Sequence, residues 1–279
     1  MEEVIKMSDL SLDPKKEANL SLDTSKDQNR STVKGKVLAV ISTARSLTLS
    51  DGTSVSCGYH LCELADLHKT LIEAGYQVMF ATPDGDTPLA DAAGVATMKP
   101  EERKDYEHYI DGLTELLIPY KLSDITEEML LHLHGLFLPG GKGALADLPN
   151  QKELKRILKH MKAHMKPIVA IGHGTAGLIQ TPDPDEPWLF YDYEMTCFPK
   201  ALEERIAKRQ ASASPAFNLE EALDEMGAEL RFHRHYTREF IVEFKELLTA
   251  QNSASVISLA KLAICHLNRN LKTRTELNH

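Results

Sequence analysis

Four short apolar runs, separated by amphipathic stretches, constrain the fold of this 279-residue chain more than any other feature. They lie at residues 34–43, 76–83, 135–141 and 166–172. Runs this short and this rich in Val, Ile, Leu and Phe are typical of strands that are buried on both faces. Their alternation with helical stretches predicts an α/β fold that has a mostly parallel sheet, helices on both faces and small inserted elements.

Helical periodicity marks the stretches between the runs. Within residues 62–76, Leu64, Leu67, Leu71 and Ile72 recur at helical spacing, and Gly75 is a typical helix stop. The same pattern predicts helices over residues 127–134 and 153–165. Near the end of the chain, residues 247–255 read as a polar turn that leads into a helix. One face of this last helix is expected to be buried by Val256, Leu259, Ala260 and Ala263.

Composition divides the chain into one domain and two tails. Residues 1–33, which are rich in Ser, Asp, Lys and Asn, are expected to be disordered; residues 34–270 form the predicted domain and residues 271–279 a short tail. Two segments do not fit the α/β alternation. Residues 99–123 are predicted to form an insertion over a strand end, and residues 203–215 a flexible surface loop or a loosely held helix. Insertions of this kind often border the ligand sites of α/β enzymes.

Charge and composition exclude several classes of protein. The net charge of −9 opposes binding to nucleic acid, because an acidic surface repels phosphate groups. No apolar run approaches the roughly 20 residues of a membrane helix, and the first residues lack the apolar core of a signal peptide. Four cysteines are too few for a disulfide framework. We therefore expect a cytoplasmic protein that binds neither nucleic acid nor membrane.

The passage PIVAIGHGTAGLI, residues 167–179, is the most informative for chemistry. A buried strand runs into a sharp turn and then directly into a helix, which is the pattern of a nucleophile elbow. Gly172 is expected at the strained tip of the turn, and His173 follows it. The helix amides beyond the tip are expected to stabilise an anion there.

Several phrases carry a resemblance to a known family. AIGHGTAGL at residues 170–178 resembles the elbow A-I-C-H-G-P-A-G/A-L of the ThiJ/PfpI superfamily, in its heat-shock chaperone and glutathione-independent glyoxalase III branch. Residues 58–85, 137–149 and 247–263 resemble three other phrases of that branch, in the same order. The resemblance extends over residues 36–267 and implies the class I glutamine amidotransferase-like fold, which is flavodoxin-like.

The chain departs from the family pattern at the reactive position itself. The nucleophilic cysteine of the family falls on Gly172, so that thiolate attack from this position is impossible. Lys142 replaces a histidine of the glycine turn, and Thr175 replaces the proline after the elbow. The resemblance makes Glu203 the candidate triad acid, with Lys200 in place of an Asp, and makes Glu63 the acid that would bond the missing thiol.

The resemblance and the residues together suggest roles for the candidate site. Glu63 is a candidate general base, and His173 is a candidate acid/base group oriented by Glu203. The amides of Gly141 and Lys142, with those beyond Gly172, are candidates for binding an oxyanion or a carboxylate. The alternatives are a solvent-facing Glu63 at a helix N-terminus and an inherited His173 without a role.

Other cysteines and histidines are candidates for reactive or metal-binding groups. Cys57 or Cys62 is either a substitute nucleophile or, as we expect, an ordinary free cysteine, and Cys197 and Cys265 are predicted to lie in the core. Two H-x-H pairs lack a third ligand, so that we predict no metal site. The phrase GGKGALAD lacks the spacing of a phosphate-binding loop, and no cofactor is expected. The H-x-H pairs are His132 with His134 and His233 with His235.

Three functions are compatible with these residues. In the first, the chain is a thiol-deficient relative that acts by binding a small carbonyl metabolite, an unfolded client or a partner protein. In the second, it is a hydratase or lyase that acts on a small carbonyl compound through Glu63 and His173. In the third, a relocated cysteine supports residual glyoxalase or deglycase activity. Members of the family often form homodimers, but no residue here identifies the surface.

Overall fold

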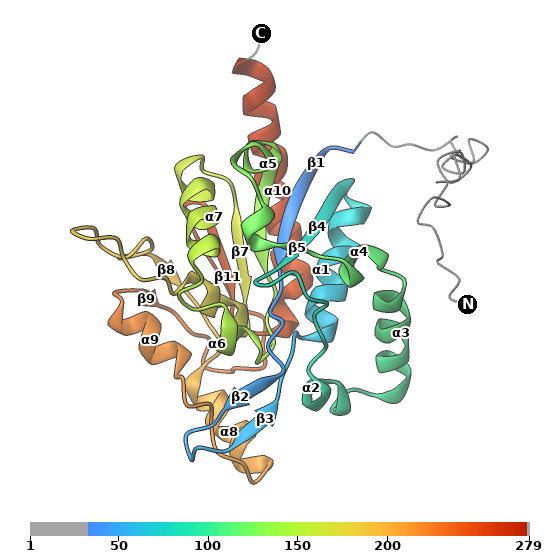
Figure 1. Ribbon diagram of the computed structural model, residues 1–279, viewed down its shortest axis with the longest axis vertical. Helices are drawn as coiled ribbons and strands as arrows, with labels where there is room; N and C mark the ends of the chain where they lie inside the picture. The colour runs from blue at the N-terminus through green and yellow to red at the C-terminus, as the bar shows by residue number, and fades with distance from the viewer. Residues whose placement is uncertain (1–32, 278–279) are drawn as a thin grey trace, which may run out of the picture. The chain divides into compact units, whose positions relative to one another are not determined.

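A seven-stranded sheet organises the chain, whose computed structural model describes residues 33–277, with side chains up to residue 271 (Figure 1). The predicted disordered tail lies outside these residues, apart from Val33. The strand order is β10-β11-β7-β6-β1-β4-β5, and every neighbouring pair is parallel except β10 with β11. This arrangement confirms the predicted α/β fold. The strands are β1 (Gly35–Val40), β4 (Tyr76–Thr82), β5 (Tyr120–Lys121), β6 (Leu133–Leu138), β7 (Ile168–Ile171), β10 (Ile241–Phe244) and β11 (Leu247–Ala250).

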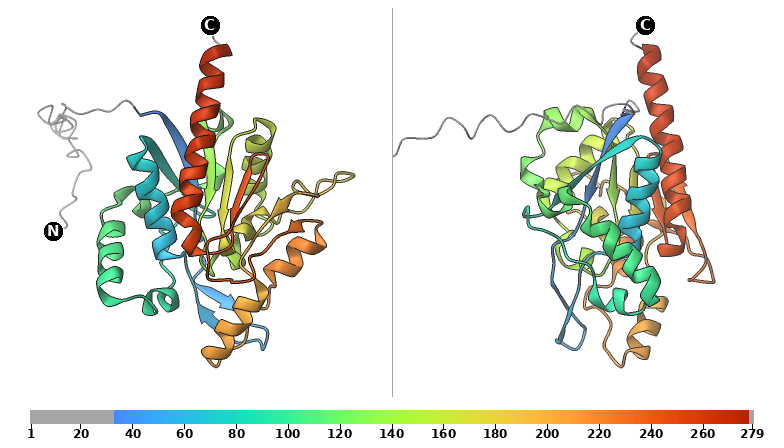
Figure 2. Two further views of the ribbon diagram at one scale, coloured as in Figure 1. Left: turned by 180° about the vertical axis from the view of Figure 1, so that it is seen from behind. Right: turned by 90° about the vertical axis from the view of Figure 1, so that its right-hand side faces the viewer.

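Helices cover both faces of the sheet. On one face α1 (Leu61–Glu73) packs against α10 (Val256–Leu277), and α3 (Pro100–Asp111) adjoins α1. On the other face lie α5 (Glu127–His132) and α7 (Lys152–Ala163). Figures 1 and 2 show the two helix layers from opposite sides. Each layer closes its own apolar cluster against the sheet, as a doubly wound domain requires.

The pairing of α1 with α10 follows from their sequences. The four residues predicted for the buried face of α10 are all 3% exposed or less, and Ala260 and Ala263 allow close approach of the two helices. The leucines of α1 are buried on the facing side, each contributing about 1.5–3 kcal/mol. The helix ends at Glu73, and Gly75 takes a left-handed φ of 88° to turn the chain into β4.

Several of the smaller elements lie at the carboxyl ends of the strands. Figure 1 shows the β2–β3 hairpin, α6 and α8 below the sheet. No helix within residues 33–277 is long and apolar enough to cross a membrane. The smaller elements are β2 (Ser46–Thr48), β3 (Ser54–Ser56), α2 (Ala92–Ala96), α4 (Thr114–Leu117), η3 (Leu122–Asp124), α6 (Ala144–Asp147), η4 (Gly172–Leu178), β8 (Glu194–Met195), α8 (Lys200–Arg209), α9 (Leu219–Glu225), β9 (Glu229–Leu230) and η5 (Ser253–Ser255).

Two strand boundaries differ from the sequence prediction. Residues 247–250, predicted as part of a polar turn, form the buried strand β11 between β7 and β10. Its one polar residue, Thr249, is satisfied because its hydroxyl accepts a hydrogen bond from the amide of Thr196. The helix predicted to reach residue 134 ends at His132, and the next two residues begin β6.

Both predicted insertions contain regular structure. Residues 99–123 contain α3, α4 and β5, with β5 at the edge of the sheet beside β4. Most of residues 203–215 belongs to α8, which is anchored by the buried side chains of Glu203 and Ala207 rather than being a flexible loop. The placement of Cys265 in the core was wrong, because this residue lies on the exposed side of α10. Cys197 is buried, as predicted.

Candidate functional site

The turn after β7 has the backbone expected of a strained elbow. Gly172 has a φ of 51° and is the first residue of η4, so that the predicted helix is a buried 3₁₀ helix. A Cβ atom on Gly172 would lie 3.6 Å from the Phe198 ring, 3.8 Å from the Gln251 carbonyl oxygen and 4.0 Å from Glu63 Oε1. These are ordinary contacts, so the space above Gly172 has room for a side chain even though the left-handed backbone disfavours one.

Glu63 is buried beside this turn. It lies in the first turn of α1, is 3% exposed, and therefore does not face solvent. Its Oε2 accepts a hydrogen bond from the Gly140 amide at 2.8 Å, and its Oε1 accepts one from the Ser253 hydroxyl at 2.7 Å. A Cβ on Gly140 would stand 2.5 Å from Glu63 Oε2, so only glycine allows this approach. Glu63 is thus held with one oxygen toward the space above Gly172.

A second buried cluster contains His173. Its Nε2 lies 2.7 Å from Glu203 Oε2, and the ammonium of Lys142 lies 3.0 Å from Glu203 Oε1. Burial acts to raise the pKa of Glu203, but the hydrogen bond and charge of His173, together with Lys142, lower this pKa to about 2. Phe198 stacks on the His173 ring at a centroid distance of 4.1 Å. The predicted pairing of His173 with Glu203 is therefore present in the structure.

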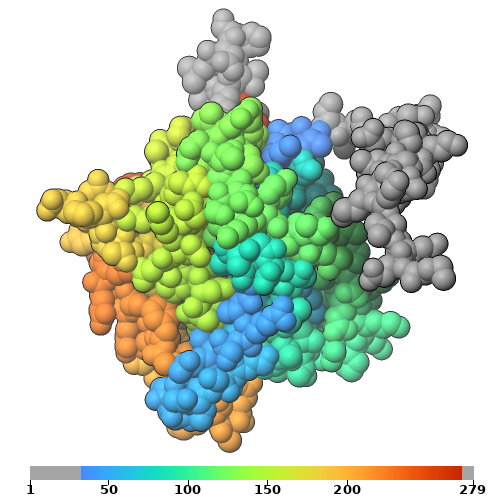
Figure 3. Space-filling view, viewed as in Figure 1, coloured from blue at the N-terminus to red at the C-terminus, as the bar shows by residue number. Residues whose placement is uncertain are grey.

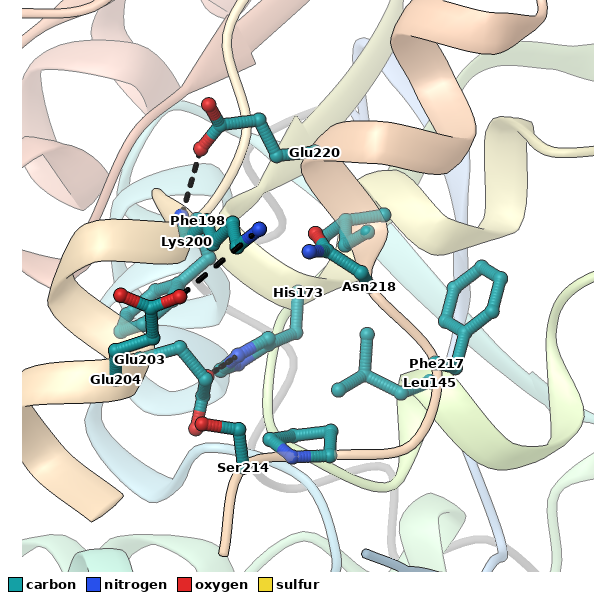
Figure 4. A pocket seen from close by; sticks show the side chains of 12 residues that line it. Leu145, His173, Phe198, Lys200, Glu203, Glu204, Ser214, Phe217, Asn218 and Glu220 are labelled. Atoms are coloured by element: carbon teal, nitrogen blue, oxygen red, sulfur yellow. Dashed lines mark hydrogen bonds and ion pairs between the residues drawn. The ribbon is translucent and has the colours of Figure 1, made fainter. Parts of the chain in front are cut away.

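A small pocket of about 60 Å³ opens beside the His173 cluster. Figure 4 shows the imidazole of His173 directed at the Glu203 carboxylate in this pocket. Ser214 and Pro215 form part of its wall, and residues 214–216 bond to the β2–β3 hairpin, seen in blue at the lower edge of Figure 3. Neither Glu63 nor Gly172 lines it. Other lining residues include Leu145, Phe198, Lys200, Phe217 and Asn218.

The predicted candidates thus form two adjacent clusters rather than one. Glu63 faces Gly172, whereas His173 faces Glu203 and Lys142. Phe198 is the side chain common to both, because it stacks on His173 and is also the nearest neighbour of a Cβ placed on Gly172.

Two backbone amides of the glycine turn are available to an anion. Within residues 33–277, neither the amide of Gly141 nor that of Lys142 donates a hydrogen bond. Gly141 has a φ of 113°, and a Cβ there would stand 2.4 Å from the Gly58 carbonyl oxygen. Glycine at this position therefore brings the turn against the segment before α1. Adjacent free amides of this kind can bind a carboxylate or an oxyanion.

The cysteines do not offer a reactive thiolate. Burial raises the pKa of Cys57 to about 11, and burial with the charge of Glu63 raises that of Cys62 to about 12. Cys62 Sγ lies 3.4 Å from His60 Nδ1, and Cys57 Sγ lies 3.5 Å from the Ala44 carbonyl oxygen. Both thiols stay protonated near neutral pH, so neither has the character of a substitute nucleophile.

Three residues near Glu63 or His173 were not identified from the sequence: His60, Phe198 and Ser253. One signal for Ser253 was present, because residues 247–263 resemble the phrase L-L-T-G-Q-N-P-x-S-A of the glyoxalase III branch, whose proline falls on Ser253. Among the side chains that the structure describes, no group of three or more His, Cys, Asp and Glu residues could hold a metal ion. His132 and His134 are divided between α5 and β6.

Comparisons with known proteins identify relatives. No protein-family model matches the chain. It is 30% identical to glutamine amidotransferase-like class 1 domain-containing protein 1 of Xenopus laevis over 192 residues, covering 68% of this chain and 78% of that protein. It is also 30% identical to the protein/nucleic acid deglycase HchA of Pseudomonas aeruginosa over 173 residues, covering 60% of this chain and 58% of the deglycase. The chain therefore spans less than two thirds of that deglycase.

Solved structures support the same fold. Glyoxalase III from Candida albicans superposes with a TM-score of 0.68 at 21% identity, covering 84% of this chain and 98% of that one. Drosophila melanogaster DJ-1beta superposes with a TM-score of 0.51 at 13% identity, covering 86% and 97%. At these identities the likeness concerns the fold alone. The relatives found by sequence, together with this likeness in fold, show that this chain belongs to the ThiJ/PfpI superfamily of glutamine amidotransferase-like proteins.

Proposed function

We propose that this chain is a cytoplasmic, thiol-deficient member of its superfamily that acts by binding a small carbonyl compound at the Gly172 turn. One observation carries the proposal. The elbow residue Gly172 has no side chain, yet the two buried clusters beside it, each built around a glutamate, are intact. Glu63 and Glu203 are both buried and both keep hydrogen-bond partners. Burying carboxylates costs free energy, so a site that had lost all function would have little reason to keep them.

The ligand class follows from the polar groups that surround the turn. The amides of Gly141 and Lys142 have no partner within residues 33–277 and suit a carbonyl or carboxylate oxygen. The Lys142 ammonium adds a positive charge near them. The names of a deglycase and of a glyoxalase III among the similar proteins agree with a carbonyl ligand.

Acid–base catalysis is the second candidate function. In that case Glu63 is the general base and His173 the acid, as in a hydratase or lyase acting on a small carbonyl compound. The observation in its favour is the contact between His173 and Glu203, which orients the ring and leaves its Nδ1 without a hydrogen-bond partner among the described residues. A Glu63→Gln variant that retains full turnover on a genuine substrate would exclude this candidate.

Calorimetric titration with pyruvate, a small carbonyl compound that also carries a carboxylate, tests the binding proposal. We expect saturable binding to the unmodified protein and roughly tenfold weaker binding to Lys142→Met, because a charge-assisted contact is lost. The matched control is Lys208→Met, which removes an exposed lysine from the last turn of α8 and leaves the site unchanged.

Two outcomes would contradict this proposal. If Lys142→Met and Lys208→Met bound pyruvate with equal affinity, the ligand would not bind at the glycine turn. Absence of binding, combined with suppression of client-protein aggregation that survives Lys142→Met, would favour an unfolded client or a partner protein as the ligand.

A further inference from the structure

We propose that Ser253 is a nucleophile in this chain, with Glu63 as its base and His60 as a hydrogen-bond donor, and that it accepts acyl groups from small activated esters. This chemistry goes beyond the proposed binding function and does not depend on it. Ser253 lies at the start of η5, just before α10, and is half-buried. Its hydroxyl is 2.7 Å from Glu63 Oε1 and 3.3 Å from His60 Nε2.

The direction of each hydrogen bond follows from counting protons. A serine hydroxyl has one proton, and Ser253 donates it to Glu63. His60 Nε2 must then be the donor to the Ser253 oxygen, which makes Nδ1 the acceptor in the neutral ring. The Cys62 thiol, whose pKa is raised to about 12 chiefly by burial, can donate to that Nδ1 across 3.4 Å. The four groups therefore form one directed chain that ends at the Glu63 carboxylate.

The backbone around Ser253 holds the hydroxyl in place. The side chain of Asn252 accepts a hydrogen bond from the Ala254 amide at 3.0 Å, which caps the turn that carries Ser253. The other oxygen of Glu63 accepts the Gly140 amide, so that Glu63 cannot rotate away from Ser253 without losing that bond. Activation requires a nucleophile within hydrogen-bond distance of its base and a base that a third group holds in position. Ser253, Glu63 and the Gly140 amide meet this requirement.

Transfer of the acyl group to Ser253 and its later hydrolysis need only the ester and water. The Ser253 oxygen attacks the acyl carbon of an ester, and its proton passes to Glu63. The oxyanion that forms on the former carbonyl oxygen accepts a hydrogen bond from His60 Nε2. The leaving alcohol departs with the proton from Glu63, which leaves an acyl-serine. Water then attacks that ester with Glu63 again as base, releasing the acid and restoring the Ser253 hydroxyl.

The contact between Ser253 and Glu63 distinguishes Ser253 from a neighbouring serine. Ser253 and Glu63 are 190 positions apart, and the hydroxyl meets the oxygen of Glu63 that also faces the space above Gly172. Ser258 provides a comparison within the next turns of α10. It is also half-buried, yet it has no carboxylate or imidazole partner among the residues that the structure describes. Ser258 therefore has the same access without the same activation.

Incubation of the full chain with p-nitrophenyl acetate tests this proposal. We expect a burst of about one p-nitrophenol per chain, and peptide mass spectrometry of the unmodified protein should locate the acetyl group on Ser253. Ser253→Ala should abolish the burst, and Glu63→Gln should slow it roughly a hundredfold. Ser258→Ala is the matched control and should acetylate as the unmodified protein does.

The proposal would be overturned if the acetyl group appeared only on lysines or on Cys62, or if Ser253→Ala, folded by circular dichroism, kept the full burst. The peptide map requires no variant, so it decides the question even where a variant fails to fold. Pyruvate binding is measured separately, and its failure would leave acetylation of Ser253 unaffected.

Discussion

Glu203 and His173 join α8 to the Gly172 turn through a contact of 2.7 Å between Oε2 and Nε2 in which both side chains are about nine-tenths buried. The Lys142 ammonium contacts the other carboxylate oxygen, so that one buried carboxylate ties together three segments. Burying an ion pair costs desolvation free energy, but once the pair is buried, removing one partner leaves an uncompensated charge and destabilises the fold. The stability of this region therefore depends on Glu203 being ionised.

Replacing Glu203 by Gln should destabilise the protein by about 2–4 kcal/mol, because the Lys142 ammonium and the His173 ring lose their buried partner. Urea unfolding followed by circular dichroism measures the change. Glu204→Gln is the control, since Glu204 is the exposed neighbour on α8 and should change stability by less than about 0.5 kcal/mol. Similar effects of the two substitutions would show that the buried contacts contribute nothing.

Stability should also depend on acid pH through the same residue. The folded pKa of Glu203 is lowered from 4.5 to about 2, so its stabilising contribution is complete above pH 5 and is lost as the pH falls toward 2. Over that window the free energy of unfolding should fall by about 3 kcal/mol more in the unmodified protein than in Glu203→Gln. Parallel pH profiles for the two proteins would contradict the low pKa.

Alanine substitutions at three glycines should separate backbone strain from steric conflict. Gly172→Ala and Gly52→Ala should each cost about 1–2 kcal/mol, because both residues have left-handed φ angles and neither added Cβ clashes. Gly140→Ala should cost more, about 3 kcal/mol, since its Cβ would stand 2.5 Å from Glu63 Oε2 and 2.7 Å from the Ile171 carbonyl oxygen. Chemical denaturation measures these losses in the free energy of unfolding. The smallest loss at Gly140→Ala would contradict the predicted steric conflict.

Alkylation by iodoacetamide at neutral pH should modify Cys265 first. This residue is exposed, whereas Cys57 and Cys197 are buried and burial raises the pKa of each of those thiols. Cys62 should also react slowly, because its pKa is raised to about 12. Time-resolved peptide mass spectrometry gives the order. Fastest reaction at Cys62 would instead support a relocated nucleophile.

The sequence predicted the core of the fold because its strongest signals are local. The buried leucines of α1 and the small residues of α10 recur at helical spacing, and the runs that became β1, β4, β6 and β7 are short and apolar. Strand β11 escaped prediction because its four residues are followed by Gln251 and Asn252, and its burial depends on β7, about 80 positions away in the sequence.

The candidate site was predictable only in part. The pairing of His173 with Glu203 follows from the resemblance, and the structure contains it. The contact of Ser253 with Glu63 joins residues 190 positions apart, so no spacing rule could have indicated it. Cys265 was misplaced because the usual burial of free cysteines was given more weight than helical periodicity, which places this residue opposite the buried face of α10.

Lactate production from methylglyoxal, compared between the unmodified protein and Gly172→Cys, tests the central claim most directly. Because the space above Gly172 accommodates a side chain beside Glu63, we predict that the unmodified protein and Gly172→Ala produce no lactate and that Gly172→Cys produces it. Adding Glu63→Gln to Gly172→Cys should remove the gain. Lactate production by the unmodified protein, unchanged by substitution of Gly172, would contradict a thiol-deficient site, and silence of Gly172→Cys would contradict an otherwise intact one.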